Sequence, residues 1–279
     1  MQSHTSHPAT ALVLGATGCI GGEMICQLRD AGWRVRALYR QAVPSKLDRD
    51  GISWLRGDAM SAADVAHAAE GCQVIVHAVN PPGYRRWAEL APPMLDNTLA
   101  AAIRERATVV LPGSVYNYGP DAYGPADAFP LLHEDAPQRP LTAKGAVRVD
   151  LERRLEAATT QGARALIVRA GDFFGPRRGN HWFAQGLVAP GKPLRTIRLP
   201  GSPGIGHQWA YLPDVGRTIL ALLQRREQLP AFARFHMAGH WDDAGSQLAA
   251  FLGSEPHTPL DEALEASLRG LGCLPPAQD

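Results

Sequence analysis

The chain has 279 residues, of which 45% are hydrophobic and 20% are charged, and its formal net charge is +1. This near-neutral charge argues against a surface built to hold nucleic acid or an anionic membrane, so we expect neither partner. No apolar run approaches the roughly 18 residues of a membrane span, and the polar residues 1–10 do not resemble a secretory signal. Four scattered cysteines without metal-ligand spacing fit a reduced, cytoplasmic location.

The first informative segment is an apolar run, residues 10–14, followed directly by glycines at three-residue spacing. Gly15 allows a sharp turn, Gly18 leaves no Cβ in the way of a diphosphate, and Gly21 lets a helix pack close to the strand. The amides and the positive end of that helix then face an anion. The segment therefore predicts a dinucleotide site, whose residues here are Gly15, Thr17, Gly18, Cys19, Ile20 and Gly21.

Strand-like and helix-like patterns alternate through the first two thirds of the chain. Apolar runs predict strands over residues 12–14, 34–39, 52–55, 74–77, 108–111 and 165–169. Helical periodicity predicts helices over residues 19–31, 62–70, 87–106 and 143–161. This alternation predicts an α/β fold, a doubly wound parallel sheet with helices on both faces. Such sheets bind ligands beyond the carboxyl ends of their strands.

After about Gly171 the alternation stops and the chain becomes rich in proline and glycine. Helices are predicted over residues 214–225, 243–252 and 260–268. We therefore expect a dinucleotide-binding Rossmann domain over residues 1–170. Residues 171–279 are expected to form most of a smaller, C-terminal substrate-binding lobe, with the option that the chain crosses back to the sheet.

The end of the second predicted strand bears on the choice of cofactor. NAD-selective folds place an acidic residue there to bind the adenosine ribose. This chain has Tyr39 and Arg40 instead, and its next carboxylate is Asp48. A guanidinium pairs well with a 2′-phosphate, and Arg36 lies nearby to assist. The residues predict NADP(H) rather than NAD(H), unless Arg40 is only a solvated cation.

Later segments add motifs in a consistent order. Residues 57–59 follow the third predicted strand, residues 77–79 end the fourth, and residues 112–119 follow the fifth. Two further segments lie at residues 169–176 and 207–215. Together with the glycine turn, these motifs resemble the NAD(P)-dependent epimerase/dehydratase family, which belongs to the extended short-chain dehydrogenases/reductases, over about residues 10–250.

The resemblance implies roles for individual residues. It assigns the adenine side of the cofactor to Asp58 and Ala59, another cofactor wall to His77, Ala78 and Val79, and the substrate oxygen to Ser114. It also implies a homodimer through the fourth and fifth helices.

The chain departs from the family where the chemistry resides. The family uses a Tyr-x-x-x-Lys pair at the start of the fifth helix, and no tyrosine here has lysine four residues later. Lys144 stands at the tyrosine position and Arg148 at the lysine position. Residues four apart share a helix face, so both are expected to point into the cofactor cleft.

Three interpretations of this replacement remain open. In the first, Lys144 donates the proton and Arg148 holds the ribose. In the second, Tyr116 transfers the proton and Lys144 only binds substrate. In the third, the site is catalytically silent and the protein is a cofactor-dependent sensor or interaction module.

Three more residues are predicted to face the substrate. Asp172 replaces the asparagine that the family has in residues 169–176, and His181 and Trp182 follow on an aromatic loop that equally fits a small core cluster. His236 and His240 have the spacing of helical metal ligands but lie in a strand-like run, so no metal is predicted. The sequence thus predicts an NADP(H)-dependent oxidoreductase or epimerase/dehydratase-like enzyme for a small carbonyl, alcohol or sugar-like substrate; the alternative is a silent sensor.

Overall fold

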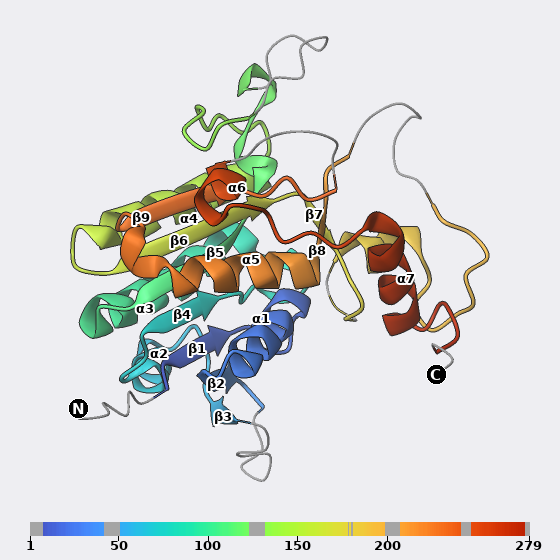
Figure 1. The fold of residues 1–279 in the computed structure, drawn as a ribbon. Coiled ribbons are helices and arrows are strands. Elements are labelled where there is room, and N and C mark those ends of the chain that lie inside the picture. The colour runs from blue at the N-terminus through green and yellow to red at the C-terminus, as the bar shows by residue number, and fades with distance from the viewer. Residues whose placement is uncertain are drawn as a thin grey trace, which may run out of the picture.

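Seven parallel strands form the central sheet, in the order β3-β2-β1-β4-β5-β6-β9 (Figure 1). The computed structural model describes residues 8–41, 51–122, 132–177, 179, 181–198, 207–240 and 247–276. The strands are β1 (Thr10–Leu14), β2 (Arg34–Tyr39), β3 (Ile52–Arg56), β4 (Val74–His77), β5 (Thr108–Ser114), β6 (Arg164–Ala170) and β9 (Phe232–His236). The strand order reverses between β1 and β4, the place where such sheets bind ligands.

Helices cover both faces of this sheet. One face carries α1 (Cys19–Asp30) and α5 (Leu212–Gln224), and the other carries α2 (Ala62–Ala69), α3 (Trp87–Glu105) and α4 (Ala143–Thr159). Within β1, Val13 packs into the first layer while Leu12 and Leu14 pack into the second. A strand buried on both faces is apolar throughout, which is why these runs were visible in the sequence. The predicted doubly wound α/β fold is confirmed.

The sheet has one strand more than the sequence predicted. β9 pairs in parallel with β6, from Ala165 opposite Phe232 to Arg169 opposite His236. The chain therefore crosses back to the sheet after the two-stranded segment described next, and α5 packs against α1 on the way. Because β9 alternates buried and half-buried residues at the sheet edge, its pattern is weaker than that of the central strands.

A smaller layer lies beyond the end of β6. β7 (Asp172–Phe174) pairs with β8 (Trp209–Tyr211), and both pack with the π-helical turn Phe183–Leu187 and α7 (Leu260–Gly270) around Phe174. α7 stands apart from the helices on the sheet (Figure 1). α6 (Gln247–Leu252) falls within the helix predicted over residues 243–252, and residues 243–246 lie outside the described part of the chain. Among the described residues, no helix is both long and apolar enough to cross a membrane.

Candidate cofactor and active site

A cavity of about 520 Å³ opens at the carboxyl ends of the central strands. Its walls come from the turn after β1, the ends of β2 and β4, the loop after β3 and the inner face of α4. The structure brings twelve of the thirteen residues predicted to bind cofactor into these walls, namely Gly15, Thr17, Gly18, Cys19, Ile20, Tyr39, Arg40, Asp58, Ala59, His77, Ala78 and Val79.

The remaining one, Gly21, shapes the turn from behind. A Cβ at Gly21 would lie 2.2 Å from the Gly15 carbonyl oxygen, so only glycine lets α1 begin this close to β1. Gly15 has φ of +80°, and a Cβ there would lie 2.4 Å from the Ala78 carbonyl oxygen. α1 begins with neither a side-chain cap nor an acidic residue in its first turn. The positive end of the α1 dipole therefore lies at the cavity wall, with no acidic residue in its own first turn to compensate it.

Two arginines near the end of β2 have different environments. Arg40 is exposed and lines the cavity. Arg36 instead donates to the carbonyl oxygens of Ala68 at 3.0 Å and Glu70 at 2.6 Å, at the end of α2. The expectation that Arg36 assists Arg40 is wrong, because α2 already binds its guanidinium. Asp48 lies outside the described residues.

The loop after β3 is held by its own hydrogen bonds. The Asp58 carboxylate accepts from the Met60 amide at 3.0 Å, and the Asp58 amide donates to Asp64 at 2.9 Å. The Ala59 carbonyl accepts from Asn97 of α3 at 2.9 Å. These contacts fix the wall that follows β3 without requiring a ligand.

His77, at the end of β4, is a neutral wall of the cavity. The Thr98 hydroxyl gives its single proton to the Met94 carbonyl at 3.1 Å, so His77 Nδ1, 2.8 Å from Thr98 Oγ1, must be the donor of that pair. Nε2 is then left as an acceptor. Burial, and next the charge of Arg148, lower the pKa of His77 to about 3.

The two cations at the family's Tyr and Lys positions diverge. Arg148 lines the cavity, donates to the Pro112 carbonyl at 3.0 Å and lies 5.3 Å from the Trp87 ring centroid. Lys144 is exposed, and its Nζ lies 5.1 Å from the ring centroid of Tyr84, itself a wall of the cavity. Only Arg148 points into the cavity as expected, since Lys144 sits in the first turn of α4, beyond that ring.

Three side chains from distant parts of the sequence meet beside the cavity, and we call them the Tyr116 cluster: Tyr116, Asp172 and His207. The Tyr116 hydroxyl donates to Asp172 Oδ1 at 2.5 Å, and His207 Nε2 lies 2.8 Å from Asp172 Oδ2. Burial raises the pKa of Tyr116, and the hydrogen bond and charge of Asp172 raise it further. Tyr116 therefore keeps its proton while Asp172 accepts from it.

His207 was not among the predicted site residues. The available signal was its place at the start of residues 207–215, where the family has an arginine. An aromatic wall extends from it: the His207 ring centroid lies 4.6 Å from that of Trp209 and 5.3 Å from that of Trp182. Trp182 stacks on Trp209 with centroids 5.6 Å apart, and remains 37% exposed.

His181 does not join this wall. It is buried, its Nε2 donates to the Arg177 carbonyl at 3.0 Å, and its Nδ1 accepts from the Ala184 amide at 3.3 Å. Both ring nitrogens thus hold the π-helical turn and neither is available to a substrate. Of the three predicted substrate residues, the structure brings Asp172 and Trp182 together and leaves His181 apart.

Ser114 ends β5 and caps the turn that carries Tyr116. Its Oγ accepts from the Tyr116 amide at 3.2 Å, and the residue is half-buried. Its hydroxyl proton is not used in that bond. The predicted role of Ser114 toward a substrate oxygen stays a prediction.

A buried ion pair contacts the turn that follows β5 and carries Tyr116 and Tyr118. Arg169, fully buried at the end of β6, binds Glu152 of α4 with Nη2 and Oε2 2.6 Å apart. Its Nη1 donates to the Tyr118 hydroxyl at 2.5 Å and to the Glu134 carbonyl at 3.0 Å. Removing one member of such a pair would leave an uncompensated buried charge. The pair therefore joins β6 and α4 to the turn after β5.

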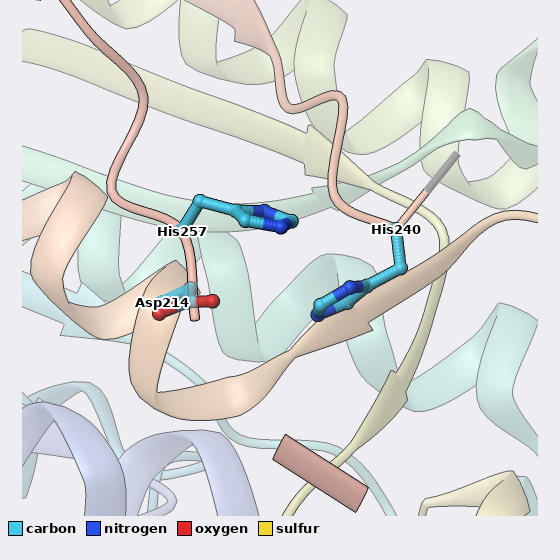
Figure 2. Close-up of side chains that lie close together, drawn as sticks. All are labelled: Asp214, His240 and His257. Carbon is cyan, nitrogen blue, oxygen red and sulfur yellow. The ribbon is translucent and has the colours of Figure 1, made fainter. Parts of the chain in front are cut away.

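A second group of polar side chains lies at the start of α5 (Figure 2). Ligand atoms of Asp214, His240 and His257 are within 4.8 Å of one another. The Asp214 carboxylate, however, accepts from the amide and the hydroxyl of Thr258, each at 2.8 Å, and from the Arg217 guanidinium. Arg217 already supplies the positive charge that a metal ion would bring. The arrangement ties the chain before α7 to α5.

Comparisons with known proteins agree with this architecture. The chain belongs to the NAD dependent epimerase/dehydratase family, whose model matches residues 11–238. A search of curated proteins finds no match. The family and the sheet together define a Rossmann-like oxidoreductase fold.

Solved structures with the same fold share little sequence with the chain. MoeE5 in complex with UDP-glucose and NAD is 19% identical, with a TM-score of 0.72 over 94% of this chain and 98% of that one. UDP-glucose 4-epimerase from Bifidobacterium longum, in complex with NAD+ and UDP, is 14% identical, with a TM-score of 0.72 over 95% and 100%. A Y136A mutant of uronate dehydrogenase from Agrobacterium tumefaciens, complexed with NAD, is 19% identical, with a TM-score of 0.63 over 98% and 92%.

Proposed function

We propose that the protein is an NADP(H)-dependent oxidoreductase, or an epimerase/dehydratase-like enzyme that uses the same hydride transfer transiently. Its substrate would be a small carbonyl compound, alcohol or sugar-like molecule. The observation that carries this proposal is the cavity of about 520 Å³ whose walls combine the glycine turn, the strand ends and Arg148. The similar structures that contain NAD support a nicotinamide cofactor.

The walls suit the parts of such a cofactor. The start of α1 would hold the pyrophosphate, because this helix N-terminus has neither a side-chain cap nor an acidic residue in its first turn. The adenosine would lie toward β2 and β3, beside Arg40 and Asp58. The other half would then pass over β4 and β5 toward His77 and Arg148, where the nicotinamide would supply or accept the hydride.

The preference for NADP(H) rests on Arg40. An exposed guanidinium stands where NAD-selective folds place a carboxylate. Charge-assisted hydrogen bonds of this type contribute about 1.5–3 kcal/mol. In calorimetry, Arg40→Ala should weaken NADP(H) binding about 10- to 100-fold and change NAD(H) binding little. Arg153→Ala, an exposed arginine of α4 paired with Asp150, is the control and should alter neither. Equal losses for both cofactors after Arg40→Ala would contradict the preference.

A second candidate function is a catalytically silent NADP(H) sensor. The position of Lys144 favours it, because this substitute for the family's tyrosine is exposed and outside the cavity walls. NADPH oxidation on a broad panel of carbonyl compounds separates the two candidates. Cofactor binding without turnover of any compound supports the sensor. If turnover occurs and survives Lys144→Ala, Lys144 is not the proton donor.

A further inference from the structure

The family's acid–base tyrosine would lie on α4, where this chain has Lys144, but the structure offers a tyrosine elsewhere. We propose that Tyr116 exchanges a proton with the substrate oxygen, that Asp172 takes up the proton that Tyr116 releases, and that His207 positions the Asp172 carboxylate. In this arrangement Tyr116 and Asp172 are the catalytic residues, and His207 is a positioning residue that acts through Asp172. The inference rests on the proposed oxidoreductase function and assigns its proton transfer.

The geometry of the Tyr116 cluster supports a directed proton path. Asp172 bridges a phenol and an imidazole through its two oxygens, at 2.5 Å and 2.8 Å. The three residues come from the turn after β5, from the first residue of β7 and from the chain before β8. A carboxylate held on both oxygens keeps one orientation, so Oδ1 stays directed at the phenol.

The cluster lies next to the cavity, although its three side chains are not among the cavity walls. Phe173, the residue after Asp172, lines the cavity, as do Tyr84 and Arg148. Tyr84 and Arg148 lie close enough to Tyr116 to influence the pKa of its phenol. Trp182, partly exposed beside His207, offers a ring surface next to the cluster. A substrate between the nicotinamide end of the cavity and Trp182 would reach the Tyr116 hydroxyl.

The charges around Tyr116 explain why a carboxylate is needed. In the family's Tyr-x-x-x-Lys pair, the lysine lowers the pKa of the tyrosine and so favours its ionised form. Here burial and Asp172 raise the pKa of Tyr116, while Arg148 only partly opposes them. A phenol in this setting does not act as a preformed phenolate. It can act as a shuttle that receives one proton as it gives another to an adjacent base.

The step balances in the oxidation direction. A bound, oxidised nicotinamide would accept the hydride as the carbinol C–H bond breaks. The substrate O–H bond breaks as its proton moves to Tyr116 Oη, and the phenol proton moves to Asp172 Oδ1. The products are a carbonyl compound, reduced cofactor and protonated Asp172, which then loses its proton to water. Reduction runs through the same transfers in reverse.

The test compares Tyr116→Phe, Asp172→Asn, Asp172→Glu and His207→Gln in the full-length protein with NADP(H). Tyr116→Phe should lower kcat about 10²- to 10⁴-fold, the range for a lost general acid–base group, with cofactor affinity unchanged. Asp172→Asn should lower kcat at neutral pH, and Asp172→Glu should restore part of it. His207→Gln should lower kcat less and leave KM unchanged. The controls Asp30→Asn and His67→Gln replace exposed residues of α1 and α2 and should match the unmodified protein.

The pH dependence of kcat for oxidation distinguishes a catalytic Asp172 from a merely structural one. Loss of a structural contact would lower kcat without changing the shape of this profile. The unmodified protein should show a nearly flat kcat from pH 7 to pH 10, because Asp172 accepts the phenol proton directly. In Asp172→Asn the phenol must ionise by itself, so kcat should rise about tenfold per pH unit.

Three results would overturn the inference. These are an active Tyr116→Phe variant, an equally flat profile in Asp172→Asn, and an unmodified protein that binds NADP(H) but turns over no compound. Calorimetry without any cofactor binding would instead overturn the proposed function itself. Because Tyr116 is 43% exposed, its replacement opens no core cavity. If thermal unfolding shows that one variant is unfolded, the profile of Asp172→Asn and the kcat of Tyr116→Phe each decide the question independently.

Discussion

The cofactor cavity and the Tyr116 cluster are neighbours built in different ways. The cavity has a part that depends on backbone: a glycine turn, strand ends and the start of α1. The Tyr116 cluster is formed by side chains that meet across 56 and 35 residues of sequence. The backbone part follows from the fold that the family shares, whereas the side-chain part depends on a few atoms in this chain.

This difference teaches where the protein tolerates change. A turn made of amides is disturbed when a Cβ is added but is insensitive to most polar substitutions. A polar cluster is disturbed when one donor, acceptor or charge is removed. Three perturbations, from the largest expected effect to the smallest, test how far this distinction holds.

The largest effect is expected in the support of the Tyr116 turn. Glu152→Leu leaves the guanidinium of Arg169 fully buried without its carboxylate. Urea denaturation should show a loss of about 3–5 kcal/mol in the free energy of unfolding. Glu89→Ala, which breaks an exposed pair with Arg86, should cost less than about 1 kcal/mol. A similar small loss in both variants would mean that the buried pair does not support this region.

A smaller effect is expected in the backbone part. Gly21→Val would place a Cβ 2.2 Å from the Gly15 carbonyl oxygen, so the turn must shift, at a cost of about 1–3 kcal/mol. Calorimetry should show weaker NADP(H) binding together with a lower melting temperature. The matched control is Gly22→Ala, whose Cβ would meet Ala16 at an ordinary 3.5 Å. Unchanged cofactor affinity in Gly21→Val would show that the glycine turn does not bind the cofactor.

The smallest change, counted over one pH unit, is a pH dependence carried by His77. Its pKa is about 3 in the folded protein against 6.5 for the free side chain, so below about pH 6.5 the unfolded chain binds a proton that the folded protein does not. Stability should therefore fall as the pH drops from 6.5 toward 3, by about 1.4 kcal/mol per unit for this group. Burial also lowers the pKa of His181 and His236, so the unmodified protein combines their contributions.

The variant His77→Asn isolates the contribution of His77. Urea denaturation at pH 7, 6 and 5 should give a shallower loss of stability than in the unmodified protein. The difference between the two slopes should approach about 1.4 kcal/mol per pH unit. Parallel slopes would show that His77 takes up a proton in the folded protein.

Sequence patterns predicted the residues of the glycine turn and of the central strands because their determinants are local. Gly15, Gly18 and Gly21 lie within seven residues, and each of the strands β1, β4 and β5 contains a run of at least three consecutive apolar residues. Arg36 was misjudged, and β9 was foreseen only as the option that the chain crosses back to the sheet. One carries a charge whose partner lies on α2, and the other is an edge strand with a weak pattern.

What the sequence by itself determined is the α/β class, the glycine turn and the position of Arg40, since each depends on residues close together in the chain. The tertiary structure alone decided that Lys144 lies outside the cavity walls and that His207 reaches Asp172. The physical reason is that the direction of a side chain and the distance between remote residues depend on how the layers pack. No spacing within the sequence encodes that packing.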